Sequence, residues 1–516
     1  MRSFRNPILS ILLITTAAFA AEKVDEAVIS KIKTEGFQNS QVMEILSYLT
    51  DVYGPRLLAT PAYREAAEWA ASEMTKWGVE NVRLENFATD LRGWEALSFS
   101  VEMIEPRYTP LLAWPRAWTS GTDGEITGVP VVIASIAELD SLQKYKGTLA
   151  GKIVLVGSGA PSTVRFESFT RRFTDEELST AAQQIEPVPE QTIGFVADRN
   201  VVDSMQLWET AKQKRVVVQQ FLIEEGVAAL ISASTFAHGI LHVDGTYLAK
   251  KDDIKSLPSF VIANEHFSRL LRMIKKGVQP KLKLHLRTQF YENPEYAVNV
   301  LAELPGTDRK LAKQLVLIGG HFDSWHAGTG ATDNAAGCAV MMEAIRILKM
   351  TGLSMRRTVR IGLWGGEEQG YYGSRGYIAK HVGDIQTGEK GAEQELISAY
   401  FNFDNGSGKI RGIYLMGNEA VRPVFKALLQ PFAYLNANTL TIQNTNFTDH
   451  EIFDVLNVPA FQFIQDPLNY MTVTHHTNMD VYDYVIEDDL KQSAVLVAAL
   501  VYHVANRDAM LPRKGR

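Results

Sequence analysis

Residues 315–350 read LVLIGGHFDSWHAGTGATDNAAGCAVMMEAIRILKM, and they indicate which fold class to expect. Leu315–Ile318 is a continuous apolar run, which predicts a strand buried on both faces. Ala335–Met350 has apolar residues at helical spacing and stops before Gly352, which predicts a helix. A strand, a loop and a helix in this order predict one unit of an α/β layer with a mostly parallel sheet.

The same alternation continues to the end of the chain. Further segments are expected as strands at Thr358–Trp364, Ala399–Phe403, Ile413–Met416 and Val458–Ile464, and as a closing helix at Asp488–Ala505. Upstream, Thr60 followed by Pro61 predicts the start of a helix over Ala62–Trp77, with Gly78 as its stop signal. The fold class expected is therefore α/β, with a mostly parallel mixed sheet flanked by helices.

The middle of the chain has a different pattern of apolar and polar residues. Residues 121–286 contain short apolar runs bounded by glycine and polar residues, such as Lys152–Val156 and Ala228–Ile231. A chain of 516 residues is too long for one ordinary domain, so at least two are expected. The middle stretch has no dense cluster of His, Asp and Glu, and it is not expected to carry the chemistry.

The N-terminus predicts a secreted or periplasmic protein. Arg2 and Arg5 precede an apolar run over residues 7–20, which ends in the small-residue pattern Ala18-Phe19-Ala20. These features are typical of a signal peptide cleaved after Ala20. A membrane anchor is the alternative, but the run is short for a bilayer span, so no stable span is expected.

The composition bears on which classes of function are expected. The net charge of −7 gives no excess of basic residues that would indicate binding to a nucleic acid. The only cysteine, Cys338, lies in an apolar helical pattern and is expected to pack as a small hydrophobe. A metal site in this chain would therefore use histidine and carboxylate ligands.

Acids and histidines follow the carboxyl ends of the expected strands, where open α/β sheets form their ligand sites. They are His321, Asp323, Glu367, Glu368, Asp404, His475 and His476. Each motif alone is common: Asp404 could be a turn residue, the two glutamates a solvated face, and the two histidines a surface pair. Four segments that deliver such groups to one edge are stronger support for a site than any single motif.

A pair of metal ions fits these residue types. Two zinc ions about 3.5–4 Å apart need imidazole and carboxylate ligands and a carboxylate that bridges them. Asp333 lies in the small-residue loop Gly328–Gly337, which would let the backbone approach the ions closely. Of the adjacent Glu367 and Glu368, one could bind metal while the other acts as a base.

The ordered set HFD at 321–323, DN at 333–334, EEQG at 367–370, Asp404 and His476 with Asp480 resembles the family of co-catalytic, two-zinc exopeptidases. This family includes aminopeptidases and glutamate carboxypeptidases. The nearest resemblance is to its carboxypeptidase Q subfamily, through HFDSW at 321–325, the His475-His476 pair and MLPR at 510–513. The resemblance spans nearly the whole mature chain.

The resemblance implies roles for individual residues. Metal ligation falls to His321, Asp333, Glu368, Asp404 and His476, with Asp333 bridging two Zn²⁺ ions, or Mn²⁺ or Co²⁺ in their place. Glu367 would be the general base. Asp323 would support His321 from behind, Asp480 would support His476, and Asp449 would have a similar supporting part. The bond between Asp333 and Asn334 is expected to be cis, as in relatives.

The resemblance also implies an organisation. We expect a signal peptide at 1–20, a catalytic domain in two parts at 21–119 and 289–516, and a strand-rich protease-associated insert at 120–288. Such inserts commonly line the entrance to the active site. The alternative is that the insert is a spacer with no part in the site. Relatives suggest a homodimer.

Candidate substrate contacts are single residues outside any motif. No acid after Glu368 stands out as a partner for a substrate ammonium, and Arg375 is a candidate for a substrate carboxylate. Tyr470 could donate to an oxyanion, or it could simply pack in the core. The function expected is hydrolysis of a terminal peptide bond in dipeptides or short peptides. A one-zinc glutaminyl cyclase and a binding protein without activity are the alternatives.

Overall fold

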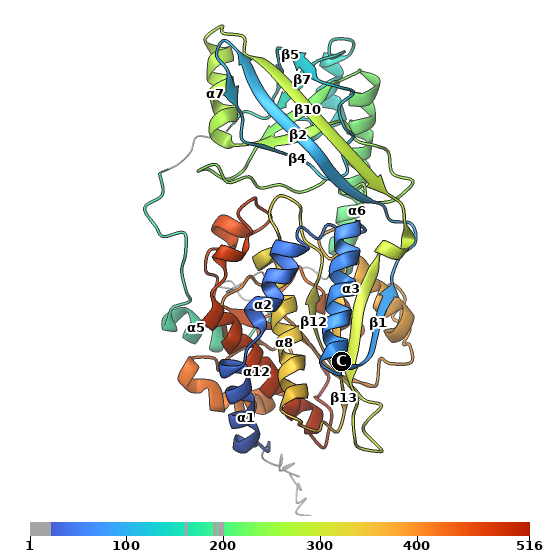
Figure 1. Ribbon diagram of the computed structural model, residues 1–516, viewed down its shortest axis with the longest axis vertical. Coiled ribbons are helices and arrows are strands. Elements are labelled where there is room, and N and C mark those ends of the chain that lie inside the picture. Colours follow the sequence, from blue (N-terminus) through green and yellow to red (C-terminus); the bar gives the residue numbers. More distant parts are fainter. Residues whose placement is uncertain (1–21, 160–163, 189–192, 194–200, 516) are drawn as a thin grey trace, which may run out of the picture.

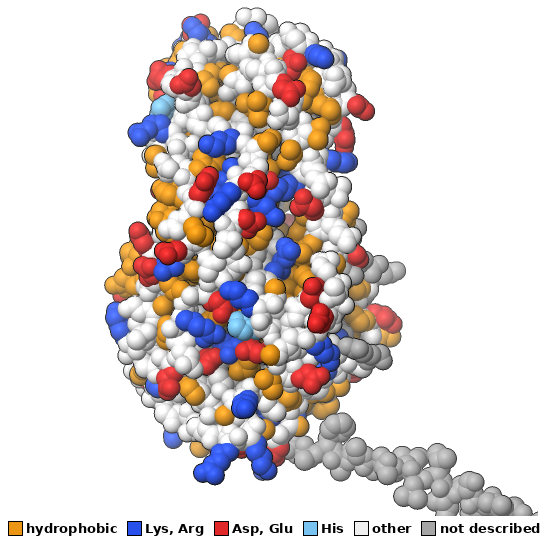
Figure 2. All heavy atoms as spheres, turned by 90° about the vertical axis from the view of Figure 1, so that its right-hand side faces the viewer, with side chains coloured by type: hydrophobic (Ala, Val, Ile, Leu, Met, Phe, Trp, Pro, Cys, Tyr) orange, Lys and Arg blue, Asp and Glu red, His pale blue; other side chains and the backbone are white. Residues whose placement is uncertain are grey.

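The computed structural model describes residues 22–159, 164–188, 193 and 201–515. The signal peptide expected at residues 1–20 lies outside this part of the chain. Two bodies are stacked along the long axis, and α6 (Val201–Glu224) lies where they meet (Figure 1). Charged side chains of both signs are interspersed over the face shown in Figure 2. Among the described helices, none is both long and apolar enough to cross a bilayer.

The lower body is built on an eight-stranded mixed sheet. In spatial order its strands are β1 (Glu80–Asn86), β11 (Val298–Leu304), β13 (Thr358–Trp364), β12 (Leu315–His321), β14 (Ile397–Asn402), β17 (Ala460–Gln465), β15 (Ile410–Tyr414) and β16 (Thr439–Thr441). The central strands β13, β12, β14 and β17 run parallel, and their side chains are buried. The expected α/β fold with a mixed sheet and flanking helices is confirmed.

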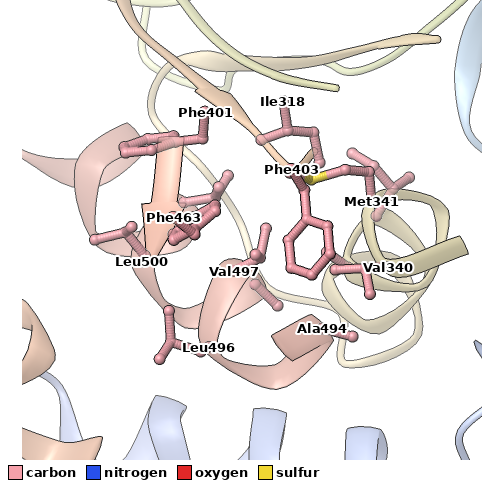
Figure 3. Packing of buried hydrophobic residues seen from close by; sticks show 14 of the residues in the cluster. Ile318, Val340, Met341, Phe401, Phe403, Phe463, Ala494, Leu496, Val497 and Leu500 are labelled. Carbon is pink, nitrogen blue, oxygen red and sulfur yellow. The ribbon is translucent and has the colours of Figure 1, made fainter. Parts of the chain in front are cut away.

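The helices α3 (Pro61–Lys76), α8 (Ala336–Met350) and α12 (Glu487–Asn506) cover one face of this sheet (Figure 1). Two further helices, α1 (Glu26–Gln38) and α2 (Val42–Ser47), pack on α8 and α12. Figure 3 shows the core between them, where Ile318 and Phe403 meet Met341 of α8 and Val497 of α12. The Thr60 cap is confirmed, since its side chain accepts from the backbone N–H of Tyr63. Cys338 is buried in this core, as its apolar helical pattern predicts.

Short helices cover the opposite face. They are α9 (Tyr372–Tyr377) and α11 (His450–Val455), and the N-terminal end of α6 packs there as well. Trp364 of β13 lies among Tyr377, Tyr400 and Phe453, with ring centroids 5.0–6.1 Å away. A further helix, α10 (Arg422–Leu429), packs against β16 and α12. The sheet is therefore covered on both faces, and the carboxyl ends of its parallel strands are left to form a site.

The upper body contains two sheets. One has the order β3 (Thr109–Pro110), β2 (Gly93–Glu105), β10 (Lys281–Tyr291) and β5 (Ile126–Gly128); the other has the order β4 (Ala113–Pro115), β9 (Ser259–Ile262), β8 (Ala229–Ala233), β7 (Ile153–Val156) and β6 (Val131–Ile133). Its helices are α4 (Leu139–Leu142), α7 (Asn264–Lys275) and most of α6. The expected insert boundary at residue 120 therefore falls inside the upper body, because β2 pairs along its whole length with β10.

The segment around α5 (Asp175–Ala182) returns to the lower body (Figure 1). Arg172 donates to Asp489 at 2.7 Å and to Asp466 at 2.8 Å, and the backbone N–H of Arg171 donates to Leu468. Part of the sequence expected to belong to the insert is thus fixed to the lower body.

Candidate metal centre and active site

The predicted residues meet at the carboxyl ends of the parallel strands. His321 ends β12, Glu367 and Glu368 follow β13, and Asp404 follows β14. His476 lies in the loop after β17, with φ at +57° in the left-handed region. These segments are held in register by the central ladder, so side chains far apart in sequence are delivered to one edge.

Two groups of potential ligands lie side by side. The first consists of His321, Asp333 and Asp404, all of them buried. The Nε2 atom of His321 lies 3.1 Å from Asp333 Oδ1 and 3.3 Å from Asp404 Oδ1. The donor set of one imidazole and two carboxylates is suited to zinc.

The second group consists of Asp333, Glu368 and His476. The Nε2 atom of His476 lies 2.9 Å from Glu368 Oε2 and 3.3 Å from Asp333 Oδ2. Asp333 thus directs one oxygen to each group, which is the arrangement expected of a bridging carboxylate. The five predicted ligands therefore fall into two sets that share Asp333.

The buried carboxylate oxygens between the two groups are suited to binding cations. Asp333 Oδ2 and Glu368 Oε1 are buried and have no hydrogen-bond partner among the described residues. Burial raises the pKa of Glu368 to about 7, with the Asp333 carboxylate adding to the shift. The Glu368 and Asp333 carboxylates raise the pKa of His476 to about 10 although burial opposes them. Crowded carboxylates of this kind are stabilised by bound cations.

Glu367 is placed beside both groups without belonging to either. Its pKa is raised well above the ordinary range, first by burial and then by the Asp404 and Asp449 carboxylates. The backbone N–H of Glu367 donates to Asp323 Oδ1 at 3.1 Å, and that of Glu368 donates to Asp323 Oδ2 at 3.4 Å. One carboxylate therefore orients the turn that carries both glutamates.

Three buried acids lie around the two groups, and one of them makes contacts different from those expected. Asp323 lies behind His321, with its Oδ1 3.7 Å from the ring Nδ1. Asp480, expected to support His476, instead accepts from the backbone N–H groups of Thr332, at 2.6 Å, and Asp333, at 3.2 Å. It therefore fixes the loop of the shared carboxylate. Asp449 accepts from the hydroxyl of Ser374 on α9 at 2.5 Å.

The expected cis bond between Asp333 and Asn334 is present. The side-chain amide of Asn334 donates to the carbonyl of Phe403 at 2.8 Å, and its Oδ1 accepts from the N–H of Gly337 at 3.0 Å. The loop that carries Asp333 is thus attached to the end of β14 and to the start of α8.

The centre opens into a cavity of about 810 Å³ between the two bodies. Tyr470 lines it, makes no hydrogen bond through its hydroxyl within the described part of the chain, and packs edge-on against His475. Arg375 lines it as well, and its guanidinium donates to the Gly370 carbonyl at 3.4 Å. Burial lowers the pKa of Arg375.

The resemblance implied that the insert would lie at the mouth of this cavity, but sequence reasoning named none of the upper-body residues that line it. Its wall includes Trp208 and Arg215 of α6 together with Asp244 and Tyr247. His242 also reaches the centre, where its ring stacks on His476 with centroids 5.8 Å apart. These residues lie on a helix and a loop without any motif, so only their position in space reveals them.

The upper body also holds the backbone of His476, one of the potential ligands. The N–H of Val243 donates to the carbonyl of His476 at 2.9 Å. Asn478 donates through its backbone N–H to Leu241, whose own N–H donates back to the side chain of Asn478 at 2.7 Å. The ligand loop is therefore fixed by both bodies.

Comparisons with known proteins agree with this geometry. Residues 299–501 match peptidase family M28. Carboxypeptidase Q from Mus musculus is 26% identical over 494 residues, which cover 95% of this chain and 91% of the relative. The Homo sapiens carboxypeptidase Q is 25% identical over 93% of this chain and 88% of its own length.

Two solved structures share the fold. A peptidase M28 precursor from Shewanella amazonensis superposes with a TM-score of 0.65 at 21% identity, covering 95% of this chain and 99% of the other. A zinc aminopeptidase from Bacillus subtilis gives a TM-score of 0.58 at 18% identity, covering 91% and 95%. Residues 299–501 thus carry a peptidase M28 domain, and the chain is a metallo-exopeptidase. Within that class it is a homologue of carboxypeptidase Q.

Proposed function

We propose that the chain is a secreted exopeptidase that hydrolyses a terminal peptide bond of dipeptides or short peptides with two zinc ions per chain. The observation that carries the proposal is Asp333, whose two carboxylate oxygens each face a different imidazole. His321 and Asp404 would hold one ion, and Glu368 and His476 the other. Mn²⁺ or Co²⁺ could occupy the same oxygen-rich set.

Zinc bound there would supply Lewis-acid polarisation of the scissile carbonyl and of the attacking water. Glu367 would take the proton from that water, because its carboxylate faces the centre without belonging to either ligand group. The same carboxyl would then pass the proton to the leaving amine. Its buried setting, which raises the pKa, suits a group that must hold a proton between the two steps.

Tyr470 and Arg375 are proposed to contact substrate. The Tyr470 hydroxyl is available as a donor to the oxyanion of the tetrahedral intermediate. Arg375 would place a cation in the wall of the cavity. Asp323, Asp449 and Asp480 would keep the ligand-bearing segments in place.

The upper body is proposed to be the protease-associated insert of this family, between the two parts of the catalytic domain. Support comes from its separate sheets and from its position over the cavity. Secretion after cleavage at Ala20 and assembly as a homodimer belong to the same proposal. Light scattering on the mature chain would check the oligomeric state.

The test combines metal analysis with a peptide digest. The mature, zinc-loaded chain is expected to contain two ions and to cleave dipeptides and tripeptides, as read by mass spectrometry. Substrates with acetylated or amidated ends would separate aminopeptidase from carboxypeptidase action. One ion per chain with cyclisation of N-terminal glutamine, or no reaction at all, would contradict the proposal.

A further inference from the structure

Arg215 is a cation without an acidic partner in the active-site cavity. It projects from α6, and no described carboxylate forms an ion pair with it. Two of the other charges that line the cavity are already paired: Lys212 bonds Asp253 at 2.8 Å, and Asp244 bonds Arg116. A guanidinium has five N–H donors in a planar fork, which matches a carboxylate.

Tyr247 holds this guanidinium in place. The carbon Cζ of Arg215 lies 4.9 Å from the centroid of the Tyr247 ring, within the range of a cation–π contact. The other neighbours of the ring include Trp325, with centroids 5.6 Å apart at an interplanar angle of 77°. Arg215 is therefore positioned by an aromatic ring, which leaves its donors available.

The hydroxyl of Tyr247 is also available. Among the described residues it makes no hydrogen bond, although the side chain lines the cavity. The backbone of Tyr247 has φ at +59°, in the left-handed region that a bulky residue adopts only at a cost. Burial raises the pKa of this phenol to about 12, and the Glu368 and Glu367 carboxylates add to the effect. The phenol thus stays protonated and can donate a hydrogen bond.

This pair lies close to the metal ligands. Trp325 packs on Tyr247 on one side and on His476 on the other, where the ring centroids are 5.9 Å apart. One indole thus separates Tyr247 from a ligand. An extended peptide spans roughly 3.3–3.6 Å per residue, so a group one or two residues from the scissile bond could reach the pair.

We propose that Arg215 and Tyr247 form a subsite for a peptide carboxylate, contributed to the active site by the upper body. The guanidinium would bind the carboxylate through two N–H donors, and the phenol would donate to one of its oxygens. The carboxylate is either the α-carboxylate of the C-terminal residue or the side chain of an Asp or Glu next to the scissile bond. This inference rests on the function proposed above.

Arg375 is the other arginine of the cavity, and it is not part of this subsite. Its guanidinium is bonded to the Gly370 carbonyl, and the charge that acts on it most is that of Tyr372. Arg375 belongs to α9 of the lower body and is available as a matched comparison.

The test measures kcat and KM for three peptides: Leu-Ala with a free α-carboxylate, Leu-Ala-amide with no carboxylate, and Leu-Glu-amide with a side-chain carboxylate only. Arg215→Gln is expected to lower kcat/KM by about 10- to 100-fold, mainly through KM, for carboxylate substrates only. Tyr247→Phe should act in the same direction, and Arg215→Lys should restore part of the loss. Loss on Leu-Ala identifies the α-carboxylate, and loss on Leu-Glu-amide identifies the side chain.

The control is Lys214→Gln, which removes one positive charge from the same helix at a side chain that does not line the cavity. It should leave all three rates unchanged. If Arg215→Gln lowers the rates for all substrates equally, or for none, the subsite is wrong while the peptidase assignment stands. The subsite is also wrong if only Arg375→Gln removes the preference for a carboxylate.

A binding measurement separates this inference from the proposed function. Calorimetry of the zinc-loaded chain would use Leu-Ala with a reduced peptide bond, as the free acid and as the amide, together with the matching Leu-Glu-amide. If no peptide is cleaved, the proposed function fails. The subsite then stands if a carboxylate ligand binds at least tenfold more tightly than the Leu-Ala amide and Arg215→Gln removes the difference. It falls if no ligand shows the difference.

Discussion

Asp333 is the residue on which both ligand groups depend, because each of its oxygens faces one of the two imidazoles. Asp333→Asn removes the shared negative charge and is expected to reduce the metal content from two ions to none. Asp404→Asn affects only one group and should leave about one ion per chain. Mass spectrometry of the metal content after gel filtration checks both values, and equal losses in the two variants would contradict a shared ligand.

Glu367 provides the second prediction at this scale. Glu367→Gln is expected to keep both metals and to lower kcat by about 10²–10⁴-fold, the usual contribution of general acid–base catalysis. Metal analysis and single-turnover kinetics on the same sample measure the two effects. An unchanged kcat would remove its assignment as the base.

That these side chains meet could be predicted from the sequence, because most of them follow a buried strand closely or lie in a short glycine-rich loop. His321, Glu368 and Asp404 are examples. The function of Asp480 could not be predicted, because the backbone groups that it binds lie far away in the sequence. Arg56 is similar: its buried guanidinium donates to the carbonyls of Phe322 and Gly330, and nothing near it in sequence indicates this.

At the scale of the elements, the start of α8 is closely packed against the end of β14. A β-carbon on Gly337 would lie 2.3 Å from the carbonyl oxygen of Phe403 and 2.3 Å from Oδ1 of Asn334. Gly337→Ala is therefore expected to destabilise the protein by about 1–3 kcal/mol and to shift the Asp333 loop. Denaturant unfolding and metal affinity measure the two effects.

Gly128→Ala is the matched control, since a β-carbon there would meet only Ile153 Cδ1, at an ordinary 3.7 Å. It should change the free energy of unfolding by less than about 1 kcal/mol. A similar cost in both variants would show that the crowding at Gly337 is relieved by movement of α8.

Element positions in the catalytic layer could be predicted, whereas the limits of the upper body could not. β12 and α8 follow from apolar periodicity in one continuous stretch. The limits of the upper body depend on β2, whose partner β10 begins at Lys281, far along the chain. The sequence of one strand does not reveal which distant strand it pairs with, so the limits of the upper body could not be read from either segment alone.

At the scale of the whole molecule, metal removal should reduce stability as well as activity. Ions that bind the native state and not the unfolded chain stabilise it by mass action, by about 2.7 kcal/mol at 100 times Kd. Dialysis against a chelator is expected to lower Tm by several degrees, and zinc should restore it. Asp333→Asn should show no difference between the two conditions, because it lacks the shared ligand. Equal Tm values for the wild type with and without zinc would contradict the expectation.

The hydrogen bond from Val243 to the backbone of His476 has a mechanical consequence. An ion bound to the imidazole of His476 would therefore also stabilise the contact between the two bodies. By thermodynamic linkage, contact between the bodies would strengthen ion binding to the same extent. The ions would then hold the two bodies together across their interface. Separation of the bodies and release of an ion would be coupled, so a protease should cut the connecting segments near Asp90 and Glu292 faster after the ions are removed.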